Sequence, residues 1–303
     1  LVETVAELVH AFEAQSEEFA QVVKLGRTQL QDAVPMTLGQ EFGAFATSLR
    51  QELQGLHRAR GDLLTFNIGG TAIGTRLNAP KGYPERAIER LREVTGLQVV
   101  LATDLIEATQ DTQAFVMFSS ALKSLAIKLS KICSDLRLLS SGPRSGLGEI
   151  QLPPRQPGSS IMPGKVNPVI PEVVNQVAYR VIGNDHAVTM AAEAGQLQLN
   201  VMEPVIAASI LESLKILANA VTTLRQNCVN GVVANEAQCR AFVENSIGLV
   251  TALVPVLGYG TASSVAAEAL ASGKSLADVL RDRDLFSDEI AAALSPERMA
   301  NPE

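Results

Sequence analysis

The most constraining feature of this sequence is a long run in which apolar residues return at alternating steps of three and four. The run extends over Phe115, Phe118, Leu122, Leu125, Leu129, Ile132, Leu136 and Leu139. A repeat of about 3.5 residues is typical of long α-helices that pack against one another. A helix that begins near Asp104 would contain about 35 residues and measure roughly 50 Å, at about 1.5 Å per residue. Ser141-Gly142-Pro143 would end it.

Helical patterns occupy most of the remaining chain. An amphipathic pattern begins at Leu1, and another runs from Met36 to Leu64. The stretch from Glu172 to Ala218 is apolar around much of its circumference, with interruptions expected at Gly183-Asn184 and Gly195-Gln196. A helix of this kind usually lies inside a bundle or between subunits. No strongly alternating run indicates a β-strand of useful length.

Composition agrees with packed helices. Hydrophobic residues make up 47% of the chain but aromatic residues only 4%, so the core must consist of Leu, Ile, Val and Ala. The last 50 or so residues contain shorter helical patterns, punctuated at Gly258-Tyr259-Gly260, Gly273 and Ser295-Pro296. We therefore expect an all-α fold, with a long central helical bundle over residues 1–248 and a small C-terminal helical domain over 249–303.

Charge and cysteine content limit the partners and the compartment. The net charge of −7 argues against a nucleic-acid partner, which requires a cationic surface. The three cysteines are odd in number and show no CxxC spacing, which favours a reducing compartment. Neither an apolar run of about 18 residues nor a signal peptide is evident. A soluble, cytoplasmic protein without a membrane contact is expected.

A polar segment near the start of the chain is the first candidate site. Gly26-Arg27-Thr28-Gln29-Leu30-Gln31-Asp32-Ala33-Val34-Pro35 could line a pocket. The residues alone favour a helix-capping loop instead, with Asp32 as the cap and Arg27 in a surface ion pair.

A second candidate is the loop Gly158-Ser159-Ser160-Ile161-Met162-Pro163-Gly164-Lys165-Val166-Asn167-Pro168. Its prolines forbid regular helix and ladder structure, and such loops commonly carry chemistry on a rigid scaffold. Taken singly, the serine pair is an ordinary turn and Lys165 a solvated lysine. Their joint occurrence at this spacing favours a functional site.

Together these segments resemble the fumarase/aspartase superfamily, in which GSSxMPxKxNP and GRTxLQDAxPxTLGQE are characteristic. The likeness covers essentially all 303 residues. The branch that acts on aspartate is also similar over Gly70–Thr75, Lys131–Arg144 and Ala192–Asn200. The resemblance implies reversible anti elimination of ammonia from L-aspartate to give fumarate, through an aci-carboxylate intermediate.

The resemblance also implies a role for each site residue. Ser159 would be the catalytic base, acting as an alkoxide that the site must stabilise strongly. Lys165 and Asn167 would hold the α-carboxylate, and donors near the loop would stabilise charge on the β-carboxylate. The substrate-binding residues would be Thr28, Gln29, Ser160, Met162, Lys165 and Asn167, supported by Glu172.

One departure from the superfamily pattern bears on the substrate. Many members carry a histidine at the position of Gln29. In those members the histidine pairs with a glutamate at the position of Glu172. Glutamine cannot shuttle a proton, and a hydratase needs that step more than an ammonia-lyase does. Gln29 therefore favours aspartate over malate, with class II fumarase as the alternative.

The other features that we considered give little support for a cofactor site or a metal site. Gly69–Gly74 has the wrong spacing for a dinucleotide fingerprint. Arg76 stands where the family usually has glycine, so the loop is either altered or in an allowed conformation. His10, His57 and His186 show no metal-ligand spacing. We expect no metal site and no cofactor requirement, although divalent cations activate parts of the aspartate-specific branch.

The resemblance further implies a homotetramer whose active sites combine segments from different subunits. The first such segment is expected before Leu1, so these 303 residues alone are expected to be catalytically impaired. An alternative of another class is a structural homologue without activity, as in lens crystallins derived from this superfamily.

Overall fold

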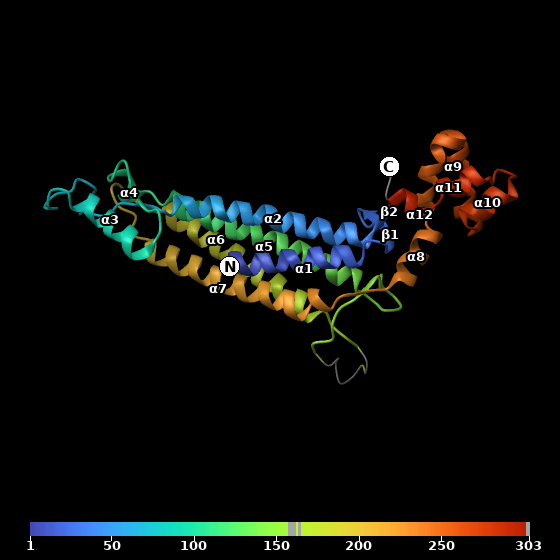
Figure 1. Ribbon diagram of the computed structural model, residues 1–303, viewed down its shortest axis with the longest axis horizontal. Helices are drawn as coiled ribbons and strands as arrows, with labels where there is room; N and C mark the ends of the chain where they lie inside the picture. Colours follow the sequence, from blue (N-terminus) through green and yellow to red (C-terminus); the bar gives the residue numbers. More distant parts are fainter. Residues whose placement is uncertain (157–161, 163–164, 301–303) are drawn as a thin grey trace. The chain divides into compact units, whose positions relative to one another are not determined.

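The computed structural model describes residues 1–156, 162 and 165–300 (Figure 1). They separate into two compact units, each built from three stretches of chain. Unit 1 comprises Leu1–Val9, Thr47–Ser134 and Val169–Arg225. Unit 2 comprises the described residues of His10–Ala46, Asp135–Pro168 and Gln226–Glu303. The expected division at residue 248 stays a prediction.

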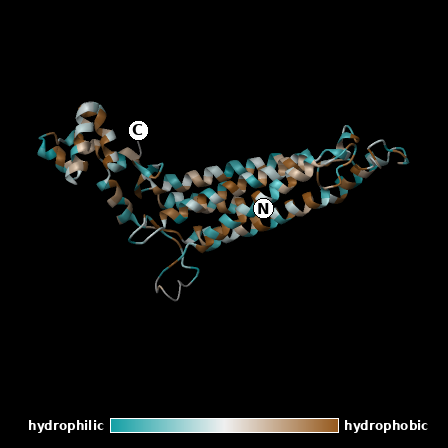
Figure 2. Cartoon of the chain, turned by 180° about the vertical axis from the view of Figure 1, so that it is seen from behind, coloured by the Kyte–Doolittle hydropathy of each residue, from teal (hydrophilic) through white to brown (hydrophobic). Residues whose placement is uncertain are grey.

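Long helices dominate unit 1, which confirms the predicted all-α class (Figure 1). They are all or part of α1 (Val2–Glu18), α2 (Leu38–Asp62), α5 (Gln113–Leu139), α6 (Val169–Glu193) and α7 (Glu203–Asn227). Leu122, Leu125 and Leu129 on α5 are fully buried, as the apolar repeat predicts. Figure 2 shows hydrophobic residues along each long helix.

Buried polar contacts fix neighbouring helices of unit 1. On α6, the Asp185 carboxylate accepts from Ser119 Oγ at 2.8 Å and from Lys123 Nζ at 2.6 Å, both on α5. Asn184 Nδ2 donates to Ser213 Oγ on α7 at 3.1 Å. The expected interruption at Gly183-Asn184 is therefore wrong, because α7 satisfies the asparagine side chain and the helix continues.

The predicted start of the α5 helix is also wrong. A separate short helix, α4 (Glu107–Gln110), is followed by Asp111, whose backbone is extended. Phe115, the first residue of the apolar repeat, is 39% exposed. Upstream lie α3 (Tyr83–Thr95) and the parallel pair β3 (Thr65–Phe66) and β4 (Val100–Leu101).

Arg76 has a left-handed backbone, with φ of 60°. Its Nη1 forms an ion pair with Glu85 Oε1 at 3.0 Å. The loop thus keeps a conformation that glycine adopts more easily, at a cost of about 1–2 kcal/mol.

Unit 2 contains an antiparallel hairpin that no sequence pattern predicted. Its strands are β1 (Val23–Thr28) and β2 (Gln31–Thr37), with a register shift between Leu25 and Arg27. The bulge at Ala33-Val34, opposite Gly26, breaks the alternation of side chains, and Pro35 within β2 argues against a strand. Both features hide the hairpin from a period-two pattern.

The C-terminal helices of unit 2 share a buried core with this hairpin. They are α8 (Glu236–Asn245), α9 (Val254–Ser272), α10 (Leu276–Asp282), α11 (Asp288–Ala293) and α12 (Pro296–Ala300), with 3-10 turns η1 (Val229–Gly231) and η2 (Ile247–Leu253). Val23 and Leu25 share a buried cluster with Val243, Leu253 and Val265. A short antiparallel pair, β5 (Ile150–Gln151) and β6 (Val233–Ala234), completes the unit.

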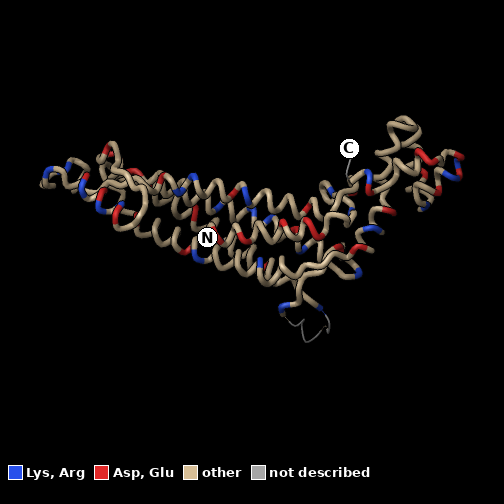
Figure 3. The backbone as a smooth tube through the Cα atoms, in the orientation of Figure 1, with Lys and Arg blue, Asp and Glu red and all other residues tan. Residues whose placement is uncertain are grey.

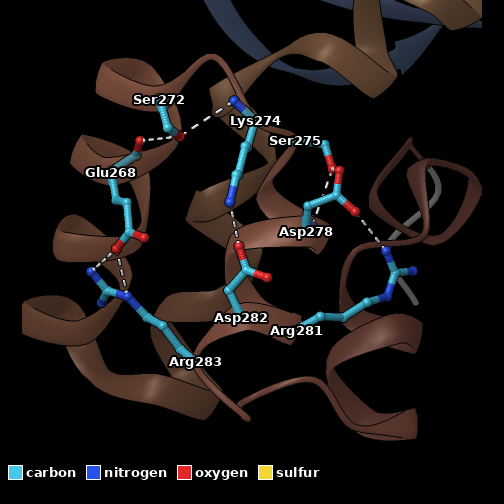
Figure 4. A network of polar contacts seen from close by, with 8 residues as sticks. All are labelled: Glu268, Ser272, Lys274, Ser275, Asp278, Arg281, Asp282 and Arg283. Carbon is cyan, nitrogen blue, oxygen red and sulfur yellow. Dashed lines mark hydrogen bonds and ion pairs between the residues drawn. The ribbon is translucent and has the colours of Figure 1, made fainter.

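Charges on the surface of unit 2 are locally paired. Lys274 forms an ion pair with Asp282 at 2.7 Å (Figure 4). The Ser275 hydroxyl and then Arg281 lower the pKa of the Asp278 carboxyl. Figure 3 shows Lys and Arg interspersed with Asp and Glu over the described chain.

Two stretches, Glu203–Gly231 and Ile247–Ser272, are long and apolar enough to cross a membrane by length and composition alone. Core helices of soluble proteins pass the same criterion. In unit 1, α7 buries Ile206, Leu217 and Leu224.

Candidate active site

The first site segment is the turn that joins β1 to β2. Thr28 ends β1, Gln31 begins β2, and Gln29 and Leu30 form the two-residue loop between them. Both loop residues are left-handed, with φ of 53° and 62°. Such turns usually contain Asn-Gly or Asp-Gly, so a glutamine followed by a leucine is strained. The Thr28 and Gln29 side chains are exposed.

The strand pair just before this turn is anchored on both sides. Arg27 and Asp32 face each other across the hairpin. Arg27 Nη1 donates to Glu149 Oε1 at 2.8 Å, and the Ser246 hydroxyl donates to Asp32 Oδ2 at 2.8 Å. The prediction of a capping loop with a surface ion pair is therefore wrong. Glu149 is fully buried, and Asp32 lies in a strand.

A buried group of charges lies behind the hairpin. Lys24 Nζ is 2.6 Å from Glu41 Oε2 and 3.1 Å from Glu149 Oε2. The side chains of Lys24 and Glu149 are 3% and 0% exposed. Two cations, Lys24 and Arg27, thus balance two carboxylates. The Arg27 guanidinium also lies 5.1 Å from the centroid of the Phe242 ring, a cation–π distance.

Only part of the second site segment, the serine loop, lies among the described residues. Ser159 and Ser160 lie outside the described residues. Met162 is exposed, and its carbonyl accepts from the Lys165 backbone N–H at 3.2 Å. The Lys165 side chain is exposed and Asn167 is half-buried. Among the described residues, no hydrogen bond joins the Thr28 turn to this loop.

Glu172, the predicted supporting residue, belongs to unit 1. It lies in the first turn of α6 and is half-buried. A carboxylate near a helix N-terminus is stabilised by the helix dipole, which gives Glu172 a local structural role as well.

The described residues offer groups that recognise a carboxylate. Thr28 supplies a hydroxyl, Gln29 and Asn167 supply amides, and Lys165 supplies a positive charge. In the described part of the chain, no group of His, Cys, Asp or Glu residues is arranged to hold a metal ion.

Sequence reasoning missed the residues that support the turn. Lys24, Glu149 and Ser246 were not predicted, because no local pattern marks a partner more than 100 positions away. A further constraint is steric, since a Cβ at Gly248 would lie 2.0 Å from the carbonyl oxygen of Ala33. The segment that carries Ser246 thus approaches the hairpin backbone directly.

The cysteines behave as apolar core residues. Burial raises the pKa of Cys228 to about 12. Burial, reinforced by the Glu149 carboxylate, raises the pKa of Cys239 to about 12. Cys133 is also buried.

Thiol labelling should therefore be slow in the native protein. Raising the pKa of a thiol from 9.0 to about 12 reduces its thiolate fraction roughly a thousandfold near neutral pH. Iodoacetamide should label Cys228 and Cys239 readily only after denaturation, as mass spectrometry of labelled peptides would measure. Native labelling as fast as that of a free cysteine peptide would contradict this burial.

Family models and known proteins match this chain over most of its length. The family model described as "Lyase" matches residues 1–183, and the one described as "Fumarase C C-terminus" matches residues 249–301. Aspartate ammonia-lyase of Pseudomonas aeruginosa is 58% identical over 100% of this chain and 64% of that protein. The Escherichia coli K12 and Corynebacterium glutamicum enzymes are 54% and 55% identical, with 63% and 58% of their lengths covered. The chain therefore spans only about three-fifths of the relatives that it matches.

Solved structures of lyases and fumarases are also similar to this chain. The fumarate lyase:delta crystallin from Brucella melitensis, bound to cobalt, superposes with a TM-score of 0.96 at 56% identity, over 99% of this chain and 65% of that one. Class II fumarase from Schistosoma mansoni gives a TM-score of 0.94 at 32% identity, over 100% and 66%. The Lyase match alone covers more than half of the sequence. The chain belongs to the lyase family of the fumarase/aspartase superfamily.

Proposed function

We propose that this protein is an aspartate ammonia-lyase, which eliminates ammonia reversibly from L-aspartate to give fumarate. The observation that carries the proposal is the 54–58% identity to aspartate ammonia-lyases over the whole chain. Gln29, which leaves the turn without a proton-shuttling histidine, supports it from the site itself. Relatives of the fumarase type share the fold at much lower identity.

The proposed chemistry is anti elimination with Ser159 as the base. The Ser159 alkoxide removes the proton from Cβ, and the electron pair enters the β-carboxylate to form an aci-carboxylate. Backbone donors near Ser160 and Met162, with the charge of Lys165, would stabilise this dianion. The carbon–nitrogen bond then breaks and the substrate's protonated amine leaves as ammonia, a better leaving group than hydroxide.

Substrate binding is proposed to involve both segments. Lys165 and Asn167 hold the α-carboxylate, and Thr28 and Gln29 place the substrate. Glu172 supports the site as a carboxylate near the N-terminus of α6. The reaction is proposed to require no cofactor, and activation by a divalent cation remains a separate proposal.

We also propose a cytoplasmic homotetramer with active sites shared between subunits. Exposed apolar side chains on α6 and α7 support self-association, since solvated helix faces rarely carry so many. On these helices, Tyr179, Met190 and Leu211 are 62%, 55% and 64% exposed.

An assay of fumarate formation tests the function. The full-length protein should produce fumarate from L-aspartate, followed by ultraviolet absorbance, and should release an equal amount of ammonia. Turnover of L-malate in place of L-aspartate would instead identify a class II fumarase. A tetramer that neither turns over nor binds a dicarboxylate would identify a structural homologue.

A further inference from the structure

The strained turn at Gln29-Leu30 requires a physical explanation. Two successive non-glycine residues in the left-handed region are unfavourable, and Leu30 is 70% exposed, so packing of its side chain does not compensate. Such conformations persist only where the surroundings over-determine them, and they gather at functional sites. The turn lies between Thr28 and Gln31, directly at the proposed substrate position.

Two clamps fix the strands one residue pair away from this turn. On β1, Arg27 is held by Glu149 at 2.8 Å. On β2, Asp32 is held by Ser246 at 2.8 Å. Because Arg27 and Asp32 are cross-strand partners, both clamps act on the same rung of the hairpin.

Each clamp is itself firmly held. The Glu149 backbone N–H donates to Leu139 O at 2.9 Å, and its carbonyl accepts from the Asn235 N–H at 2.8 Å. The Ser246 hydroxyl also accepts from the Gly248 N–H at 3.0 Å, which fixes the direction of its own donor. These bonds leave little freedom to either anchor.

Stability alone does not account for the first clamp. Desolvating a carboxylate and a guanidinium is costly, and a well-packed apolar pair is often at least as stable. A charged anchor with a defined geometry instead fixes register and orientation. Arg27, on one side of this ion pair, directly precedes Thr28. Glu149, on the other side, directly precedes β5, and the chain continues from β5 toward the serine loop.

We propose that Arg27, Glu149, Asp32 and Ser246 are positioning residues that hold the strained turn in its substrate-binding conformation. This inference rests on the proposed function. Without the clamps, the turn relaxes and Thr28 and Gln29 no longer meet the substrate in the productive geometry. Ground-state binding should therefore suffer more than the chemical step.

The test uses Ser246→Ala in the full-length protein, because it removes one neutral donor without leaving a buried cation unpaired. We expect KM for L-aspartate to rise about tenfold, with kcat reduced less than about threefold. Hydrogen exchange of the peptide over residues 25–37 should become faster. Glu149→Gln should act in the same direction and combine non-additively with Ser246→Ala.

A rescue variant separates positioning from general destabilisation. Leu30→Gly lowers the backbone strain. In Ser246→Ala/Leu30→Gly, the raised KM and the faster hydrogen exchange should therefore return most of the way to the parent values. Unchanged KM in Ser246→Ala, or no recovery in the double variant, would overturn the clamp. If the parent protein turns over neither L-aspartate nor L-malate, the proposed function fails. Faster exchange in Ser246→Ala, reversed by Leu30→Gly, would still support a clamp on the turn.

Discussion

Replacing Ser159 with alanine is expected to reduce kcat/KM for L-aspartate about 10²–10⁴-fold, the usual contribution of a positioned general base. The substitution removes the only atom proposed to accept the Cβ proton. It removes no proposed contact with the α-carboxylate. Fumarate binding, measured by calorimetry, should therefore remain close to that of the parent protein.

The control is Ser145→Ala, which deletes an exposed hydroxyl from the preceding Gly/Pro-rich stretch. That variant should retain full turnover. Ser145→Ala should unfold at the parent temperature because Ser145 is exposed. Ser159→Ala is expected to do the same, since the Gly/Pro-punctuated sequence around Ser159 predicts a loop outside the helical core. Appreciable elimination by Ser159→Ala would assign the base to another residue.

Replacing Lys24 with methionine is expected to lower the free energy of unfolding by about 3–5 kcal/mol, the range for breaking a buried ion pair. Methionine fills a similar volume but leaves Glu149 buried with only Arg27 as a cation partner, and Glu41 without its 2.6 Å contact. Urea unfolding followed by circular dichroism would measure the loss.

Lys274→Met is the matched control in the same unit. Lys274 also pairs with a carboxylate at a short distance, but both side chains are more than half exposed to solvent. Water screens that pair, so the unfolding midpoint should barely change. Equal losses from the two substitutions would mean that burial of the Lys24 cluster contributes nothing.

Apolar periodicity predicted the helices where side chains meet a continuous core. Leu122 to Leu136 are buried at the expected spacing. The pattern failed at its start, where Phe115 is exposed and α5 begins at Gln113, but α5 ends at Leu139, just before Ser141-Gly142-Pro143 as predicted. A repeat reports which face is apolar, but the residues that stop a helix act through local backbone geometry.

The hairpin and its anchors were beyond sequence reasoning for a different reason. Its strands contain a bulge and a proline, and its turn lacks the glycine that normally marks such a loop. Asp32 was interpretable as a helix cap because its partner, Ser246, is 214 residues away. Only the folded chain brings these residues together.

The site itself was predicted through motif resemblance rather than local physics. The described structure places Thr28 and Gln29 on one exposed turn. It places Lys165 and Asn167 on an accessible segment. The proposed base lies outside the described residues, so Ser159 remains a prediction that the substitution experiment decides.

The hydrogen bond between Asp32 and Ser246 also determines when the hairpin can be completed during protein synthesis. A ribosome that adds roughly 5–20 residues per second needs about 10–40 s to pass from the first partner to the second. Throughout that interval the turn at Gln29-Leu30 lacks one of its clamps, and β1 lacks the C-terminal side chains that cover it. The turn at Gln29-Leu30, the proposed substrate-binding turn, is therefore among the last parts of unit 2 to reach its final conformation on the nascent chain.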